Sequence, residues 1–153
     1  MMLRRFHFIA GLLATLAIAI FFVSTVVAEL FGSHEAVAAV KALIVAPGLF
    51  ILVPAIAAAG GCGFFLSKVR QGRLVDAKKK RMPFIAANGL LLLIPCAIYL
   101  NRWAAAGVFD STFYWVQSTE LLAGAINLIL MCLNIRDGLS MKRQFRATSR
   151  TAR

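Results

Sequence analysis

Two glutamates, Glu29 and Glu120, lie in or beside long apolar stretches of the sequence, where little water is available to solvate an ionised carboxylate. Such a carboxylate costs up to about 2.5–3.5 kcal/mol inside a membrane helix unless a base pairs with it. Arg102 is the nearest base to Glu120 by expected depth, and Lys41 is the second. Two acids and two bases at similar depth predict either a structural ion-pair network or a polar binding pocket.

The apolar segment 113–135 also carries amides, which share one face of the helix that this segment predicts. At about 100° per residue, Gln117, Glu120, Asn127 and Asn134 fall within about 100° of arc. A polar face of this kind is expected to contact protein and not lipid. By depth, the candidate polar residues of the whole chain form two layers. The outer layer is predicted to contain Glu29, Tyr99, Arg102, Gln117 and Glu120, and the cytoplasmic layer His7, Asn88, Asn127 and Asn134.

The candidate cofactor ligands are the two histidines, His7 and His34. If the helices alternate in direction, these residues lie at opposite faces of the membrane, so one chain cannot supply both axial ligands of one b-type haem. Alternatively, a quinone ring could form hydrogen bonds with Tyr99, Glu120 and Arg102. Both cofactors stay open, each histidine can also be an ordinary interfacial residue, and we predict no metal site.

No catalytic motif accompanies these residues. The three cysteines, Cys62, Cys96 and Cys132, lie in apolar segments without a CxxC pair, so they are expected to be small apolar residues. The glycine-rich stretch 60–64 lacks the preceding strand and the Lys-Ser/Thr of a phosphate-binding loop. No HExxH, GxSxG or two-carboxylate motif is present. We therefore predict a protein without catalytic activity.

The elements that would position these residues are four transmembrane helices. Of the 153 residues, 61% are hydrophobic and only 15% are charged, whereas a soluble domain is nearer 45–50% apolar and about 25% charged. Four apolar segments reach the roughly 20 residues that a helix needs to cross a bilayer. The sequence predicts an all-α, polytopic membrane protein: a four-transmembrane-helix bundle in residues 1–135, with helices at about 6–30, 38–67, 82–102 and 113–135, and a basic cytoplasmic tail at 136–153.

The distribution of basic residues predicts the orientation. If four helices alternate, 15 of the 17 Lys and Arg residues lie on one side, and only Lys41 and Arg102 lie on the other. Short loops rich in Lys and Arg stay in the cytoplasm, so both termini are expected there, in a cell (inner) membrane. This asymmetry explains the net charge of +11 without nucleic acid, and the basic loop is expected to attract anionic lipids. The segment before Ala28 also resembles a cleavable signal, although its length favours a retained anchor.

Three function classes remain in competition. The first is an accessory membrane component that binds a partner subunit or forms a homo-oligomer, which the small size and the missing catalytic motifs favour. The second is a redox carrier that holds b-type haem or quinone inside the bundle. The third is an oligomeric proton or small-solute transporter in which Glu29 and Glu120 titrate.

Overall fold

The structure, a computed structural model, describes the backbone of residues 2–68 and 73–151 and the side chains of residues 2, 5–63 and 80–140. Every regular element in these residues is helical. In chain order the elements are α1 (Met2–Phe31), α2 (His34–Leu43), η1 (Ile44–Gly48), α3 (Leu49–Lys68), α4 (Arg73–Asn88), η2 (Gly89–Leu93), α5 (Ile94–Ala105) and α6 (Ser111–Thr151), where η1 and η2 are short π-helical segments.

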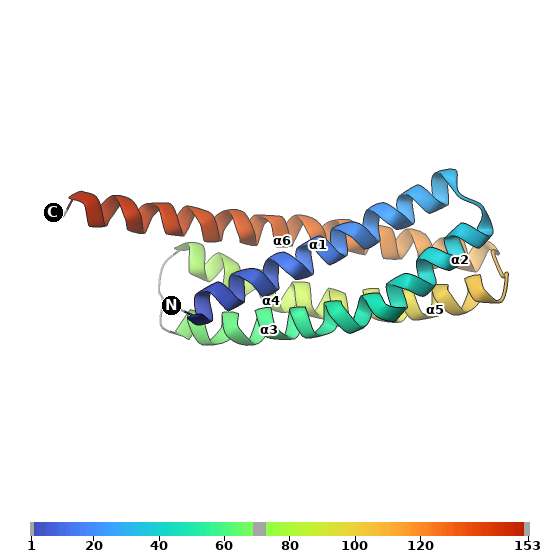
Figure 1. Ribbon diagram of the computed structural model, residues 1–153, viewed down its shortest axis with the longest axis horizontal. Helices are drawn as coiled ribbons and strands as arrows, with labels where there is room; N and C mark the ends of the chain where they lie inside the picture. The colour runs from blue at the N-terminus through green and yellow to red at the C-terminus, as the bar shows by residue number, and fades with distance from the viewer. Residues whose placement is uncertain (1, 69–72, 152–153) are drawn as a thin grey trace.

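These elements form four long rods that lie side by side (Figure 1). The first rod is α1, the second is α2–η1–α3, the third is α4–η2–α5, and the fourth is α6. Within the described residues, each rod contains a segment long and apolar enough to cross a membrane: Arg5–Phe31, His34–Gly63, Lys80–Ala105 and Ser111–Ser140. The prediction of four such helices is confirmed.

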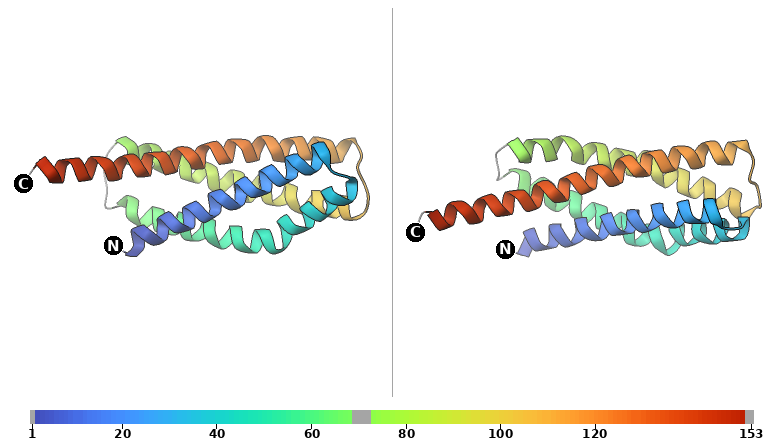
Figure 2. Two further views of the ribbon diagram at one scale, coloured as in Figure 1. Left: turned by 45° about the horizontal axis from the view of Figure 1, so that its top comes forward. Right: turned by 90° about the horizontal axis from the view of Figure 1, so that it is seen from above.

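The two ends of the bundle differ in what they contain. The α1–α2 and α5–α6 connections meet at one end, which we call the turn end (Figure 1). The opposite end, which we call the terminal end, holds the start of α1, the end of α3 and the start of α4. From there α6 continues past the other rods, as the two further views also show (Figure 2). The helix expected to end near residue 135 therefore runs on to Thr151.

Prolines interrupt the regular geometry of two rods. In η1, Ala46 has extended backbone angles (φ −140°, ψ 116°), so the helix expected at 38–67 is broken at this residue, before Pro47. In the third rod, Pro95 is the second residue of α5, which follows η2. A proline has no N–H, and its ring clashes with the carbonyl four residues earlier, so the wider π-helical turn gives the chain room. The two irregular segments face the interior of the bundle through Ile44 and Gly89, both of which are buried.

Local sequence signals explain the turn end. The Ser33 hydroxyl caps α2 by accepting a hydrogen bond from the Ala36 amide at 3.3 Å. At the end of α5, Gly107 adopts a positive φ of 68°, and its amide donates to the Ala104 carbonyl at 3.1 Å. Val108 donates to Trp103, which completes a Schellman-type cap. The Asp110 carboxylate then accepts from the Phe113 amide at 2.9 Å and starts α6.

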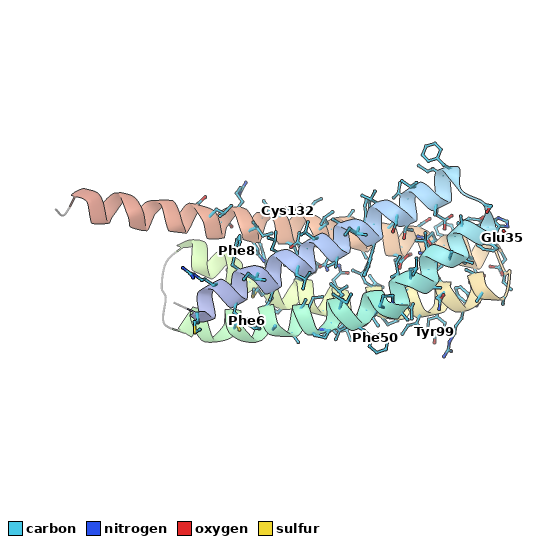
Figure 3. The ribbon with its side chains drawn as sticks, in the orientation of Figure 1. Phe6, Phe8, Glu35, Phe50, Tyr99 and Cys132 are labelled. Carbon is cyan, nitrogen blue, oxygen red and sulfur yellow. The ribbon has the colours of Figure 1, made fainter. Side chains whose placement is uncertain are left out.

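Among the described side chains, alanine is the most frequent apolar residue buried between the rods. One core cluster lies in the middle of the bundle and includes Ala14, Ile18, Leu52, Ala55, Ile85 and Met131. A second, which we call the turn-end core, includes Ala28, Val37, Cys96, Leu100, Ala104 and Phe113. Large apolar side chains instead cover the outside, for example Phe50 (78% exposed) and Leu91 (77% exposed). Phe50 projects outward in Figure 3, and Phe6 and Phe8 are also exposed.

Candidate functional site

A buried ion pair joins α2 to α6 near the turn end. The Lys41 Nζ lies 2.5 Å from the Glu120 Oε2, and the two side chains are 1% and 13% exposed. Gln117, one helical turn before Glu120, donates from its Nε2 to the same oxygen at 3.2 Å. Two charges removed from water attract each other strongly, but they compensate their desolvation only when paired and hydrogen-bonded, as they are here.

Glu29 brings a second carboxyl group to this place. It lies on α1, within electrostatic range of Lys41, Glu120 and His34. Its Oε1 is buried and has no hydrogen-bond partner among the described atoms, and the same is true of the Gln117 Oε1. We call Glu29, Lys41, Gln117 and Glu120 the Lys41 cluster. It contains two carboxyl groups and one ammonium group.

The turn-end core positions this cluster. Val37, one helical turn before Lys41, is 4% exposed and packs in the same cluster of side chains as Leu100 and Phe113, both fully buried. Phe113 in turn lies one helical turn before Gln117 on α6. Apolar packing therefore fixes the rotation of both α2 and α6, and this rotation directs Lys41 and Glu120 toward each other.

Lys41, and not Arg102, is the partner of Glu120. The sequence ranked Arg102 first because of its expected depth, and a constant 100° per residue also placed Arg102 and Tyr99 on one face with Asn88. The π-helical turns of η2 lie between Asn88 and these residues and change the helical phase. As a result Arg102 is exposed and Tyr99 is 54% exposed, and Figure 3 shows Tyr99 pointing away from the bundle.

A cavity of about 150 Å³ lies between the rods, next to the Lys41 cluster. Residues of α1, α3, α4, α5 and α6 and of both π-helical segments line it, and most of them are apolar. Its polar lining residues are Thr25, Glu120 and Asn127. Gly89 and Gly124 also line it, and their missing side chains leave room inside the bundle. We call this space the central cavity.

Asn127 is the unusual residue of the central cavity. It is 0% exposed, and neither its Nδ2 nor its Oδ1 has a hydrogen-bond partner among the described atoms. A Cβ built on Gly89 would lie 3.9 Å from the Asn127 Nδ2, so the amide lies close to the backbone of η2. A buried amide without partners costs on the order of 1–3 kcal/mol, which makes its retention informative.

The other predicted polar residues lie apart from the cavity lining. The Asn88 Nδ2 donates to the Ala123 carbonyl at 2.9 Å and so joins α4 to α6. Asn134 is buried, and its Oδ1 has no partner among the described atoms. The His7 Nδ1 lies 2.9 Å from the Ala59 carbonyl oxygen at the terminal end. His34 stacks on Phe109 at the turn end, with ring centroids 4.1 Å apart.

The two histidines are therefore not brought together, and one haem cannot use both histidines of a single chain. The structure adds an ion pair that the sequence did not suggest: the Arg81 Nη1 contacts the Asp137 Oδ2 at 2.7 Å, near the terminal end. The Arg136 Nη2 lies 3.4 Å from the other carboxylate oxygen. Asp137 is the only acid in the basic segment 136–153, a signal that could have suggested a partner.

No known protein-family model, curated protein or solved structure matches this chain. Its function must therefore be inferred from two features of its own: the Lys41 cluster and the central cavity with Asn127.

Proposed function

We propose that this chain is a multi-pass membrane protein that binds a small amphipathic molecule from the lipid phase between its helices. The observation that carries the proposal is the central cavity, which is mostly apolar and has an unpartnered amide in its wall. Ligand sites are typically apolar hollows with a few polar groups that fix orientation, and bundles build such sites from inward-facing side chains.

The distribution of side chains supports the membrane part of the proposal. Large apolar residues such as Phe50 and Leu91 face outward, whereas Lys41, Gln117 and Asn127 face inward. In water this arrangement would expose far more apolar surface than a soluble monomer tolerates. In a bilayer the arrangement is favourable, because lipid contacts the apolar surface and the polar groups contact one another.

The proposed orientation rests on the unequal distribution of the Lys and Arg residues between the two sides of the membrane. The turn end would lie outside the cytoplasm, and the terminal end, with both termini, would lie inside. The proposed location is the cell (inner) membrane. Most of the basic loop 68–81, with its expected attraction to anionic lipids, lies outside the described side chains. The partner-binding role, a homo-oligomer and the transport role of Glu29 and Glu120 stay predictions.

Quinone binding is the second candidate function, without the contribution expected from Tyr99 and Arg102. Tyr99, Glu120 and Arg102 were expected to hydrogen-bond the ring, but Tyr99 and Arg102 are exposed, and only Glu120 of these three lines the central cavity. The central cavity offers other polar groups, and it lies inside the bundle where a lipid-soluble molecule would reside.

Accessibility labelling tests the orientation. In a variant carrying Cys62→Ser, Cys96→Ala and Cys132→Ser, single cysteines would be introduced as Ser111→Cys at the turn end and Ser140→Cys near the terminal end. Both positions are exposed. With a membrane-impermeant maleimide on intact spheroplasts, we expect labelling at residue 111 and none at residue 140 until the membrane is permeabilised. The reverse pattern would contradict the orientation, and labelling of both at equal rates would contradict the membrane embedding.

A cavity-filling variant tests the binding. We expect native mass spectrometry of the wild type, released gently from detergent, to show a bound small molecule. Gly89→Leu should lose it, because the new side chain would extend toward Asn127 and occupy the central cavity. Gly60→Leu is the matched control, since a side chain there meets nothing within 4 Å. Equal retention in the two variants, each with wild-type helicity and elution volume, would contradict the proposal.

A further inference from the structure

We infer that Asn127 is the residue that recognises the polar head of the bound molecule, and that this head is a single six-membered ring with oxygen substituents. The inference rests on the proposed function, because it concerns the same central cavity. It adds the ligand's chemical class and the residue that selects it.

The size of the cavity limits the head group. An apolar cavity of about 150 Å³ is large enough for one benzene ring and too small for a fused polycyclic system. A haem would not fit. The walls next to the ring would be aliphatic and aromatic, including Ile18, Phe22 and Leu52. One flat ring is therefore the largest head that this space accepts without movement of the helices.

The chemistry of Asn127 sets what the ring carries. An amide offers donors on Nδ2 and an acceptor on Oδ1, and here both atoms are unpartnered. The Nδ2 would donate to a ring carbonyl, and the Oδ1 would accept from a ring hydroxyl. A quinone and its hydroquinone differ in this respect, so one asparagine can hold either form. A purely hydrocarbon ligand would leave both amide atoms unsatisfied.

The cavity lies close to the outer surface of the bundle on one side. Val53 of α3 and Leu90 of η2 both line it, and they are 38% and 51% exposed. An alkyl tail attached to the ring would leave between these two residues and lie against lipid. The fit is thus to an amphipathic molecule with a ring head and an apolar tail.

Asn127 lies apart from the Lys41 cluster. Seven residues, about two helical turns or about 10 Å, separate Glu120 from Asn127 on the same face of α6. Glu120 is already bonded to Lys41 and Gln117, so its paired oxygen is not available to a ligand. Asn127 is the cavity-lining side chain whose amide atoms are both unpartnered among the described residues.

The test compares two probes with the same ring size and the same tail: a one-ring benzoquinone with a short alkyl tail and the corresponding alkylbenzene, which lacks the two carbonyl oxygens. Binding to the full chain in lipid nanodiscs would be measured by equilibrium dialysis against protein-free nanodiscs. We expect the wild type to prefer the quinone by about 3- to 10-fold, the range of one neutral hydrogen bond. Asn127→Leu should abolish this preference and keep the alkylbenzene affinity.

The matched control is Asn134→Leu, which replaces another buried asparagine that does not line the cavity and should keep the preference. If Asn127→Leu keeps the quinone preference, Asn127 does not recognise the head, although the cavity still binds. If the wild type binds both probes equally, the ring class is wrong and the proposed function stands. If the wild type binds neither probe above the blank, the inference is overturned, and the native mass spectrum then decides the proposed function separately.

Discussion

The Lys41 cluster and the central cavity lie on the same face of α6, yet they treat buried polar groups in opposite ways. In the cluster, the Lys41 ammonium and the Glu120 carboxylate are joined directly, and Gln117 adds a hydrogen bond. In the cavity, Asn127 is equally buried but has no protein partner on either amide atom. A polar group that the protein satisfies holds helices together, whereas one that it leaves open is available to a ligand.

Breaking the satisfied pair should have the largest effect. Lys41→Met would leave the Glu120 carboxylate buried beside Glu29 without a counter-charge, and removal of one partner of a buried pair costs about 3–5 kcal/mol. The free energy of unfolding should fall by this amount, measured from helicity as the mole fraction of denaturing detergent increases. The double variant Lys41→Met, Glu120→Gln should recover most of the loss, since it removes the stranded charge.

Arg102→Met is the matched control for this experiment. Arg102 is a base at the same end of the bundle, but it is exposed, so its loss should change the free energy of unfolding by less than about 0.5 kcal/mol. Equal effects of the two substitutions would show that the Lys41–Glu120 pair does not stabilise the bundle.

Replacing the unpartnered amide of Asn127 should instead raise the free energy of unfolding. Asn127→Leu replaces an unpartnered amide by an apolar side chain of similar shape, so the ligand-free protein should gain about 1–3 kcal/mol of unfolding free energy. Asn88→Leu should instead lose about 1 kcal/mol, because the Asn88 Nδ2 bonds to the Ala123 carbonyl. Both changes can be followed in the same unfolding titration. A loss of stability in Asn127→Leu would mean that the amide has a partner in the folded protein.

The periodicity of the sequence predicted the four long helices and the shared polar face of α6. Four apolar segments indicated the four long helices, and the spacing of Gln117, Asn127 and Asn134 indicated one shared face. In the structure these three side chains are 3%, 0% and 7% exposed. Both results follow from the regular 100° advance of an uninterrupted helix, and α6 is uninterrupted from Ser111 to Thr151.

The partner of Glu120 was ranked wrongly because the ranking used expected depth alone, and depth does not tell which way a side chain points. A constant 100° per residue placed Arg102 and Tyr99 with Asn88, but η2 changes the phase after residue 88. The rotation of Lys41 depends on α2, which the break at Ala46 separates from α3. Neither the lack of a protein partner for the Asn127 amide nor the volume of the cavity can be read from one chain's sequence, because both depend on how the four rods pack together.

Asp137 is a third buried polar group, and it lies at the terminal end. Its two arginine partners differ in exposure, so they test how burial affects the strength of an ion pair. Asp137 is mostly buried and contacts both Arg81, which is 27% exposed, and Arg136, which is 69% exposed. Arg81→Met should cost about 1–2 kcal/mol of unfolding free energy, between the values for exposed and buried pairs. Arg136→Met should cost less than about 0.5 kcal/mol, because its 3.4 Å contact is open to solvent. A larger loss of unfolding free energy in Arg136→Met than in Arg81→Met would show that burial does not determine the strength of these ion pairs. The contrast between the Lys41 cluster and Asn127 would then need a physical basis other than burial and hydrogen bonding.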